Sequence, residues 1–472
     1  MVQKNTSLDS HLSRRDFLKA GVKGSAGLAA FSGITFLTRS ERVFGANDRL
    51  RVAVAGVRSQ GFVHVQSFAK QPKTEVVALC DVDENVLRLR LADMEKLGLP
   101  KPQTYVDYRQ LLEDKSIDAV SIATPNHWHS LMGIWACQAG KDVYVEKPCS
   151  HNLWEGRQLV RAAGKYNRVV MHGTQGRTAG GYLAGIKKMR EGLIGELYMA
   201  RGLCFKWRDT IGRAPVEPVP PGVHYDLWTG PARLKPFTRN RFHYNWHWVW
   251  DTGDGDIGNQ GVHEIDLARW GLGVGLPRKI SAIGGHFMFD DDQETPNTLN
   301  CTFEFDLPGG QRRMLVFEVR HWITNTEVGI GTPGFGEGAG ALAPAPGVVN
   351  KPSKFVVGDV FYGSRGYVAM SGTDTYRSWL GENQEPGPTA TGGENRWAHF
   401  LECVRNHTPE KVNAPIEEGH LSCALIHLAN ASYRLGRTLH FDPEREEVIG
   451  DDEANRMLRG SYREPYVVPE KV

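Results

Sequence analysis

Short apolar runs alternate with amphipathic segments from residue 50 to residue 173. The runs are rich in β-branched residues and predict strands, and the segments between them predict helices. The predicted strands are 51–56, 75–80, 118–124, 141–146 and 168–173, and the predicted helices are 61–70, 84–97, 128–140 and 154–166. Apolar strands separated by helices form parallel sheets covered on both faces, so we expect a doubly wound, Rossmann-type α/β domain over residues 47–175.

The pattern changes after residue 190, where strand-like runs follow one another with few helices. Such runs predict an α+β domain with a large, mostly antiparallel open sheet over residues 176–472. The predicted strands are 196–205, 279–289, 297–306 and 312–322, and the predicted helices are 261–270, 396–406 and 419–436. The Gly/Pro-rich residues 328–350 predict a surface loop, with a lid or an oligomer contact as alternatives.

The first 46 residues have a different composition. Arg14 and Arg15 precede a weakly apolar stretch, 20–37, that is rich in Ala, Gly and Ser. This arrangement resembles a twin-arginine (Tat) signal peptide, so we expect export through the Tat translocase to the periplasm. The alternatives are an uncleaved signal that tethers the protein to the membrane and an amphipathic N-terminal helix.

Charge and cysteine content narrow the classes of partner. The 472 residues carry 56 basic and 54 acidic side chains, a net charge of +2, which predicts neither nucleic acid nor an anionic membrane as partner. The seven cysteines are odd in number and form no C-x-x-C pair. We therefore interpret them as buried thiols and expect no disulfide framework and no metal site.

A glycine-rich turn follows the first predicted strand. In "GVRSQG", Gly56 and Gly61 fill the outer positions of the dinucleotide fingerprint G-x-G-x-x-G, and Arg58 takes the middle one. Asp81 ends the second strand, where a carboxylate binds ribose hydroxyls and repels a 2′-phosphate, so NAD is favoured over NADP. The alternative for Asp81 is a helix N-cap. The predicted cofactor-binding residues are Gly56, Val57, Arg58, Gly61, Asp81, Thr124, Pro125, Asn126, His129, Glu146, Lys147 and Gln175.

A charged pair and a proline interrupt the strand in "VYVEKPCS". Lys147 therefore stands at the carboxyl end of a parallel strand and faces the ligand crevice of such a sheet. Burial beside a cationic nicotinamide ring lowers the pKa of a lysine. We expect Lys147 to take a proton from a substrate hydroxyl while hydride leaves the same carbon.

Five stretches together resemble the glucose-fructose oxidoreductase / inositol dehydrogenase / MocA (Gfo/Idh/MocA) family, from about residue 50 to residue 440. They are "AVAGVRSQG", "LCDVD", "ATPNHWH", "EKP" and "GNQGVHEIDLARW". The resemblance implies a second catalytic motif, D-x-x-x-H, at Asn259 to His263, with His263 as acid/base or hydroxyl-orienting group. Asn259 replaces the aspartate and cannot take a proton, which leaves more of the work to Lys147 and His263. The family also implies a homo-oligomer formed through the C-terminal sheet.

Aromatic side chains crowd the stretch 241–256 just before this motif. Sugar faces stack on aromatic rings while polar groups bind the hydroxyls, so the stretch predicts a carbohydrate site. The alternative is one face of a core strand. The predicted substrate residues are Arg177, Lys206, Tyr244, Trp246, His247 and His263.

These features predict an NAD-dependent oxidoreductase that acts on a hydroxyl of a sugar, polyol or glycoside. Because no free NAD pool is expected outside the cytoplasm, we expect tightly held NAD that is recycled within the catalytic cycle. Two schemes close that cycle: transfer of hydride between two sugars, and an NAD-dependent glycosidase reaction, which the family resemblance also implies. A cytoplasmic enzyme using free NAD and a non-catalytic, cofactor-bound sugar-binding protein remain alternatives.

Overall fold

The computed structural model describes residues 49–331, 355–372, 374–393 and 395–472. The predicted signal peptide and most of the predicted loop at 328–350 lie outside these residues. In the described part of the chain, no helix combines the length and the apolar character that crossing a membrane requires.

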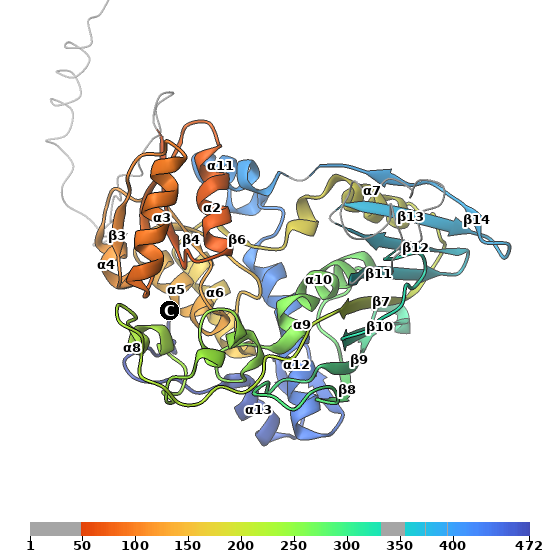
Figure 1. The fold of residues 1–472 in the computed structure, drawn as a ribbon. Coiled ribbons are helices and arrows are strands. Elements are labelled where there is room, and N and C mark those ends of the chain that lie inside the picture. The colour runs from red at the N-terminus through yellow and green to blue at the C-terminus, as the bar shows by residue number, and fades with distance from the viewer. Residues whose placement is uncertain (1–48, 332–354, 373, 394) are drawn as a thin grey trace, which may run out of the picture. The chain divides into compact units, whose positions relative to one another are not determined.

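A parallel sheet of six strands forms the N-terminal part of the described chain (Figure 1). Its order is β3-β2-β1-β4-β5-β6, and every pairing is parallel. The strands are β1 (Leu50–Ala55), β2 (Thr74–Cys80), β3 (Gln103–Tyr105), β4 (Ala119–Ile122), β5 (Asp142–Val145) and β6 (Val170–His172). The chain reverses its direction of progress across the sheet between β1 and β4, and a ligand crevice opens at the carboxyl ends of the strands at such a point.

Helices link these strands and continue into the next part of the chain. They are α2 (Gln60–Ala69), α3 (Glu84–Lys96), α4 (Tyr108–Glu113), α5 (Asn126–Gln138), α6 (Leu153–Lys165), η1 (Gln175–Thr178) and α7 (Gly180–Arg190). The central strands β4 and β5 are wholly buried, as expected of a sheet covered by helices, whereas the edge strand β3 is exposed or half-buried.

A second sheet of eleven strands follows, and it is mixed but mostly antiparallel (Figure 1). Only β7 and β10 run parallel to each other among its described pairings. The strands are β7 (Leu197–Lys206), β8 (Lys279–Gly285), β9 (Thr298–Asp306), β10 (Arg312–His321), β11 (Phe355–Gly363), β12 (Gly366–Ser371), β13 (Thr375–Leu380), β14 (Glu385–Pro386), β15 (Ala390–Thr391), β16 (Leu439–Asp442) and β17 (Glu447–Val448). The predicted fold class is confirmed.

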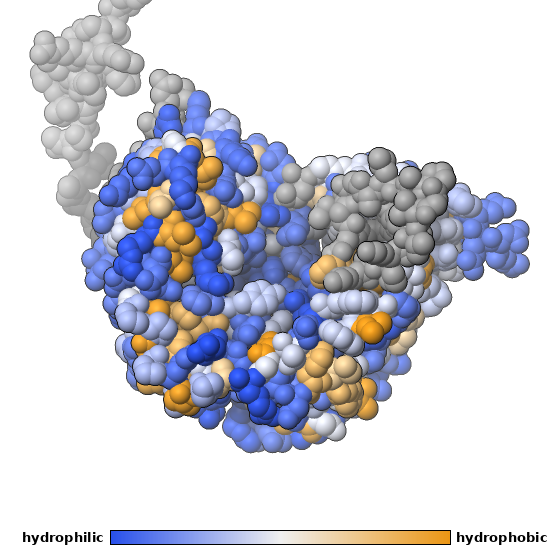
Figure 2. Space-filling model, in the orientation of Figure 1, coloured by the Kyte–Doolittle hydropathy of each residue, from blue (hydrophilic) through white to orange (hydrophobic). Residues whose placement is uncertain are grey.

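Alternation in β9 shows why this sheet has one covered face. Leu299, Cys301, Phe303 and Phe305 are buried, and the residues between them are exposed or half-buried, which is the period of two that a strand imposes. Helix α10 packs on β7, β10 and β11 on the covered face. On the face that Figure 2 shows, hydrophobic side chains form separate patches among hydrophilic ones.

The helices of this second part bring the two sheets together. They are α8 (Tyr225–Thr229), η2 (Arg239–Arg241), η3 (Asn245–Trp248), α9 (Gly255–Asn259), α10 (Gly261–Leu272), η4 (Pro308–Gly310), α11 (Arg396–Asn406), η5 (Pro409–Lys411), α12 (Ile416–Leu435) and α13 (Asp452–Arg459). The long helix α12 contacts α6 and β6 of the first sheet and β8 of the second. It therefore connects the first sheet to the second.

Candidate active site

A cleft of about 620 Å³ lies at the carboxyl ends of β1, β2, β4 and β5. Its opposite wall comes from the residues around α8 and η3 and from the start of α10. The cleft therefore stands at the switch point of the parallel sheet, where ligands bind in open α/β folds. Most of the predicted site residues line it: Gly56, Arg58, Asp81, Thr124, Pro125, Asn126, His129, Glu146, Lys147, Gln175, Tyr244, Trp246, His247, Asn259 and His263.

The turn after β1 leaves no room for side chains at its two outer glycines. Gly56 has φ +79°, and a Cβ there would lie 2.6 Å from the carbonyl oxygen of Ala123. A Cβ on Gly61 would lie 1.9 Å from the carbonyl oxygen of Gly56. This close packing of turn, helix and neighbouring strand is what the dinucleotide fingerprint requires, so the turn fits the pyrophosphate of NAD.

The carboxylate of Asp81 is held by the same turn. The backbone N–H of Val57 donates to Oδ2 at 2.9 Å, and that of Asp83 donates to Oδ1 at 3.0 Å. Burial raises the pKa of Asp81 to about 6, although both N–H groups lower it. The N-cap of α3 is Asp83 and not Asp81, which removes the capping alternative. Asp81 thus stays in the cleft at the place where a ribose would lie.

Lys147 lies between the cofactor half of the cleft and its aromatic wall. Its Nζ donates to the backbone carbonyl of Asn259 at 2.6 Å. Burial lowers the pKa of Lys147, against the charge of Glu146, which raises it. A lysine with a lowered pKa is available as a neutral base at a lower pH than a free lysine.

Glu146 is committed to its own contacts. Its Oε1 lies 3.0 Å from Nε2 of His64 and accepts from Nε2 of Gln60 at 3.2 Å. Burial alone would raise the pKa of Glu146, but the contact with His64 and the charge of Lys147 outweigh burial and lower it. Glu146 is therefore an ionised anchor for Lys147 and not a proton acceptor.

His263, on the first turn of α10, faces the cleft as a neutral imidazole. Burial and the charge of Lys147 lower the pKa of His263 to about 3. Its Nδ1 has no hydrogen-bond partner among the described residues. Asn259 precedes it by one turn, and its Nδ2 donates to Asp256 Oδ1 at 3.2 Å. The side chains of His263 and Asn259 can both donate and accept hydrogen bonds at a substrate hydroxyl.

Asp256, the last residue of the aromatic stretch 241–256, organises this wall, although it was not among the predicted site residues. Arg208 donates to it through Nε at 2.6 Å and Nη2 at 2.8 Å, and His321 Nε2 lies 2.9 Å away. Burial would raise the pKa of Asp256, but Arg208 and His321 reverse the effect and hold it well below its usual value. The sequence pattern does not indicate this cluster, because Arg208 and His321 lie 48 and 65 residues away from Asp256 in the chain.

The aromatic stretch before α9 forms turns and not a strand. Tyr244, Trp246 and His247 line the cleft, and the rings of Trp246 and His247 stack at 3.6 Å. Trp248 is buried beneath them, with the guanidinium of Arg208 4.9 Å from its ring centre. The core-strand alternative is therefore wrong, because the 3-10 turn η3 presents several consecutive side chains to one cavity.

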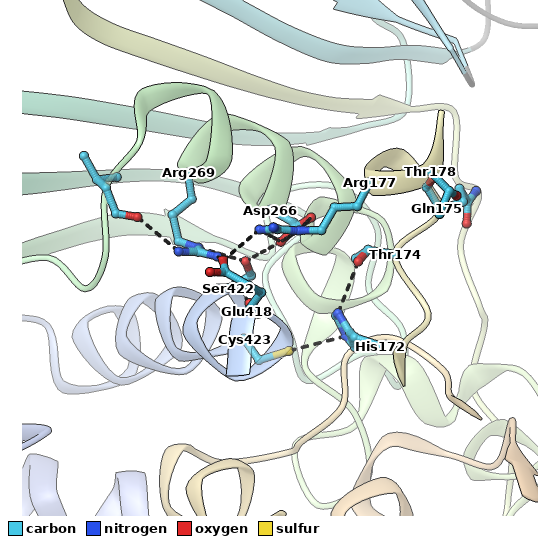
Figure 3. A network of polar contacts seen from close by, with 11 residues as sticks. His172, Thr174, Gln175, Arg177, Thr178, Asp266, Arg269, Glu418, Ser422 and Cys423 are labelled. Carbon is cyan, nitrogen blue, oxygen red and sulfur yellow. Dashed lines mark hydrogen bonds and ion pairs between the residues drawn. The ribbon is translucent and has the colours of Figure 1, made fainter. Parts of the chain in front are cut away.

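Two predicted substrate residues do not reach the cleft. Arg177 is 5% exposed, and it donates to Asp266 through Nε and Nη2 and to Glu418 through Nη2 (Figure 3). Lys206 Nζ bonds Gln260 Oε1 behind the wall. Neither lines the cleft, because carboxylates pair with the charge of Arg177 and the amine of Lys206 donates to an amide oxygen. That they bind substrate directly stays a prediction. Of the predicted cofactor residues, Val57 and Gly61 act through backbone packing and do not line the cleft.

Comparison with protein families matches both parts of the chain. The oxidoreductase family model for the NAD-binding Rossmann fold matches residues 50–174, and the model for the C-terminal alpha/beta domain of the same family matches 187–281 and 377–468. The chain belongs to the Gfo/Idh/MocA oxidoreductase family. Its N-terminal part, residues 50–174, therefore has an NAD-binding Rossmann fold.

Curated relatives of this Gfo/Idh/MocA chain match it in part. A "Glycosyl hydrolase family 109 protein" of Shewanella putrefaciens is 31% identical over 205 residues, which is 40% of this chain and 44% of the relative. An "Alpha-N-acetylgalactosaminidase" of Shewanella oneidensis is 30% identical over 204 residues, with the same coverage. The matched region thus spans less than half the length of these relatives.

Solved structures share the fold over most of the chain. The aldose-aldose oxidoreductase of Caulobacter crescentus, complexed with glycerol, has a TM-score of 0.58 at 17% identity and covers 83% of this chain and 100% of its own. Levoglucosan dehydrogenase, in complex with NADH and L-sorbose, has a TM-score of 0.58 at 16% identity and covers 83% of this chain and 98% of its own. At this identity the likeness concerns the fold alone.

Proposed function

We propose that the protein oxidises a hydroxyl group of a sugar, polyol or glycoside, with an NAD that stays bound and is recycled within each catalytic cycle. One observation carries the proposal: Lys147, half-buried and with a lowered pKa, stands between a dinucleotide-type turn and an aromatic wall. The glycine turn fits the pyrophosphate of NAD, and Asp81 fits the adenosine ribose, in keeping with the NAD-binding Rossmann fold of the family. Bound NAD supplies a hydride acceptor beside Lys147.

The residues of the cleft divide the work on the substrate. Neutral Lys147 takes the proton of the reacting hydroxyl, and the carbonyl of Asn259, 2.6 Å from Nζ, holds the amine in place. Neutral His263 and the amide of Asn259 orient the hydroxyl. The rings of Trp246 and Tyr244 offer apolar faces for the sugar ring.

Glycoside cleavage is the second candidate, and the names of the curated relatives favour it. A ketone formed on the sugar ring acidifies the neighbouring C–H bond. Loss of that proton expels the aglycone by elimination, water adds to the resulting double bond, and the ketone is reduced back to the alcohol. The cycle consumes one water and returns the hydride, so no external oxidant is needed. An α-N-acetylgalactosaminide is the first substrate to test.

The paired Arg14 and Arg15 and the small-residue stretch behind them support export by the Tat route to the periplasm. Retained NAD follows from that location, because a released cofactor would not be replaced there. We also propose a homo-oligomer that uses the open face of the eleven-stranded sheet. There are two alternatives to catalysis by retained NAD: a cytoplasmic or tethered enzyme that uses free NAD, and a cofactor-bound sugar-binding protein without turnover.

The first experiment distinguishes catalysis by retained NAD from these two alternatives. The purified full-length protein is freed of loose nucleotide and denatured, and the supernatant is assayed for NAD(H); we expect about one equivalent per chain. The same preparation is then screened with glycosides and pairs of sugars without added NAD, and we expect turnover. An empty protein that turns over only with added NAD would contradict the retained cofactor, and a loaded protein without any turnover would support the binding protein.

Deuterium distinguishes glycoside cleavage from net oxidation. Elimination and hydration in D₂O place deuterium on the carbon next to the one that is oxidised, and nuclear magnetic resonance of the released sugar detects it. Direct hydrolysis of the glycosidic bond leaves that position protonated. Cleavage without deuterium incorporation would therefore exclude the elimination scheme.

A further inference from the structure

Three buried side chains of metal-ligating types lie close together outside the lining of the active-site cleft. Cys149 lies in the turn after β5, His172 ends β6, and Cys423 lies on α12. All three are buried, with exposed fractions of 0%, 1% and 0%, and their ligand atoms lie within 4.8 Å of one another. In the described part of the chain no fourth His, Cys, Asp or Glu joins them.

Two of the three distances in the group are close to those in the coordination shell of a small thiophilic cation. Sγ of Cys149 lies 3.8 Å from Sγ of Cys423, and the latter lies 4.0 Å from Nε2 of His172. With Zn–S near 2.3 Å and Zn–N near 2.0–2.1 Å, tetrahedral to trigonal geometry places two sulfurs about 3.8–4.0 Å apart and sulfur and nitrogen about 3.6–3.8 Å apart. For these two pairs, closure around an ion needs shifts of only about 0.2–0.4 Å, and the ligand atoms of Cys149 and His172, which lie within 4.8 Å of each other, must approach by at most about 1 Å. A disulfide, in contrast, requires sulfurs at about 2.05 Å.

The histidine ring is already oriented for ligation. Its Nδ1 lies 3.3 Å from Oγ1 of Thr174, and the ring stands between Thr174 and Cys423 in Figure 3. When Nδ1–H donates to Thr174, the lone pair of Nε2 is directed to the sulfur side, which is the outer-shell arrangement of metal-ligating histidines. A Cβ on Gly419 would lie 2.7 Å from Cγ of His172, so α12 packs directly on the ring and fixes it.

We propose that Cys149, His172 and Cys423 form a buried site for one thiophilic d¹⁰ cation, in the first place Zn²⁺. Two thiolates neutralise the dication, and their two protons leave when the ion binds. The ion ties the turn that carries Lys147 to α12, and so it holds the two sheets in register at the cleft. Its role is structural, and it takes no part in the redox step.

Another cysteine of the chain provides the matched control. Cys301, on β9, is 0% exposed like the two cysteines of the group, and burial alone raises the pKa of its thiol. Cys301→Ser therefore tests the general cost of a hydroxyl in the core. The variants Cys149→Ser and Cys423→Ser test the site itself.

Element analysis of the full-length protein, expressed with Zn²⁺ and passed over a weak chelating resin, is the first test. We expect about one zinc per chain in the wild-type protein and in Cys301→Ser, and loss of the ion in Cys149→Ser and Cys423→Ser. If the wild-type protein binds copper in place of zinc and Cys423→Ser loses it, the site is supported and only the identity of the ion changes. Far less than one ion per chain in the wild type, retention of the ion in both site variants, or a Cys149–Cys423 disulfide in the mass spectrum overturns the proposal.

Cobalt gives an answer that needs no variant to fold. The wild-type protein expressed with Co²⁺ in zinc-depleted medium should show the near-ultraviolet charge-transfer absorption of thiolate–cobalt bonds. Removal of the metal with a strong chelator should lower the Tm, because an ion that binds only the folded chain stabilises it. Stoichiometric cobalt without the charge-transfer absorption would mean that the thiolates do not ligate the ion, and would overturn the proposal.

Discussion

Replacing Lys147 with methionine removes the amine and keeps most of the length and apolar volume of the side chain. In the structure the side chain is half-buried, its Nζ donates to the carbonyl of Asn259 at 2.6 Å, and the charge of Glu146 raises its pKa against the effect of burial. A positioned general base contributes about 10²–10⁴-fold, so the barrier to hydride transfer should rise by about 3–5 kcal/mol. Because the glycine turn and Asp81 hold the nucleotide, the variant should still contain NAD.

The assay is single-turnover reduction of the seated cofactor, followed by the absorbance of the reduced nicotinamide after mixing with sugar. Lys206→Met is the matched control, since its amine lies behind the cleft wall and bonds Gln260. The charge of Lys206 lowers the pKa of Lys147, so this control should move the pH midpoint upward and leave hydride transfer at high pH largely intact. A Lys147→Met protein that reduces its NAD within a few-fold of the wild-type rate would refute the assigned role.

Three further predictions test other parts of the site. The rate of hydride transfer should rise with pH with a midpoint below 10.5, since burial lowers the pKa of Lys147, and it should show no step near pH 6.5, since the pKa of His263 is about 3; a loss of rate as pH rises from 6 to 9 would contradict both assignments. Gly56→Ala should abolish NAD retention and lower the Tm, whereas Gly98→Ala, also at positive φ but in open space, should lower the free energy of unfolding by only about 1–2 kcal/mol and keep the cofactor. Equal effects in the two variants would count against the close approach at Gly56. Arg177→Met removes the ion-pair partner of the buried carboxylate of Asp266, so it should lower the free energy of unfolding in urea by about 3–5 kcal/mol and raise the KM for sugar no more than a few-fold. A large rise in KM with unchanged stability would instead indicate that Arg177 binds substrate.

The parallel sheet could be predicted from the sequence because its strands are continuous apolar runs. β4 and β5 are buried on both faces, so each reads as an unbroken apolar segment followed by a polar one. The same logic placed Asp81 and Lys147 at one edge, since the carboxyl ends of parallel strands converge. Strands β11, β12 and β13 escaped prediction although β11 pairs with β12 and β12 with β13 as neighbours in the chain. Gly358 and Asp359 interrupt the apolar run of β11, and its other partner, β7, is distant in the chain.

The candidate site was less predictable where charges pair inside the protein. Arg177 stands in a polar stretch beside a predicted cofactor residue, and nothing local shows that Asp266, 89 residues away, draws it into the core. Asp256 was overlooked for the same reason. Cys149 and Cys423 are 274 residues apart, so the sequence showed two isolated thiols where the fold brings a pair together.

The central claim is that a seated NAD is reduced and reoxidised during each turnover of a carbohydrate. The most direct test is a stopped-flow experiment with the purified, cofactor-loaded protein, its substrate and no added nucleotide. We expect the absorbance of the reduced nicotinamide to rise and return to its starting value as product forms, at a rate that falls at least about 100-fold in Lys147→Met. Product formation without any transient reduction, and at the same rate in Lys147→Met, would contradict the central claim.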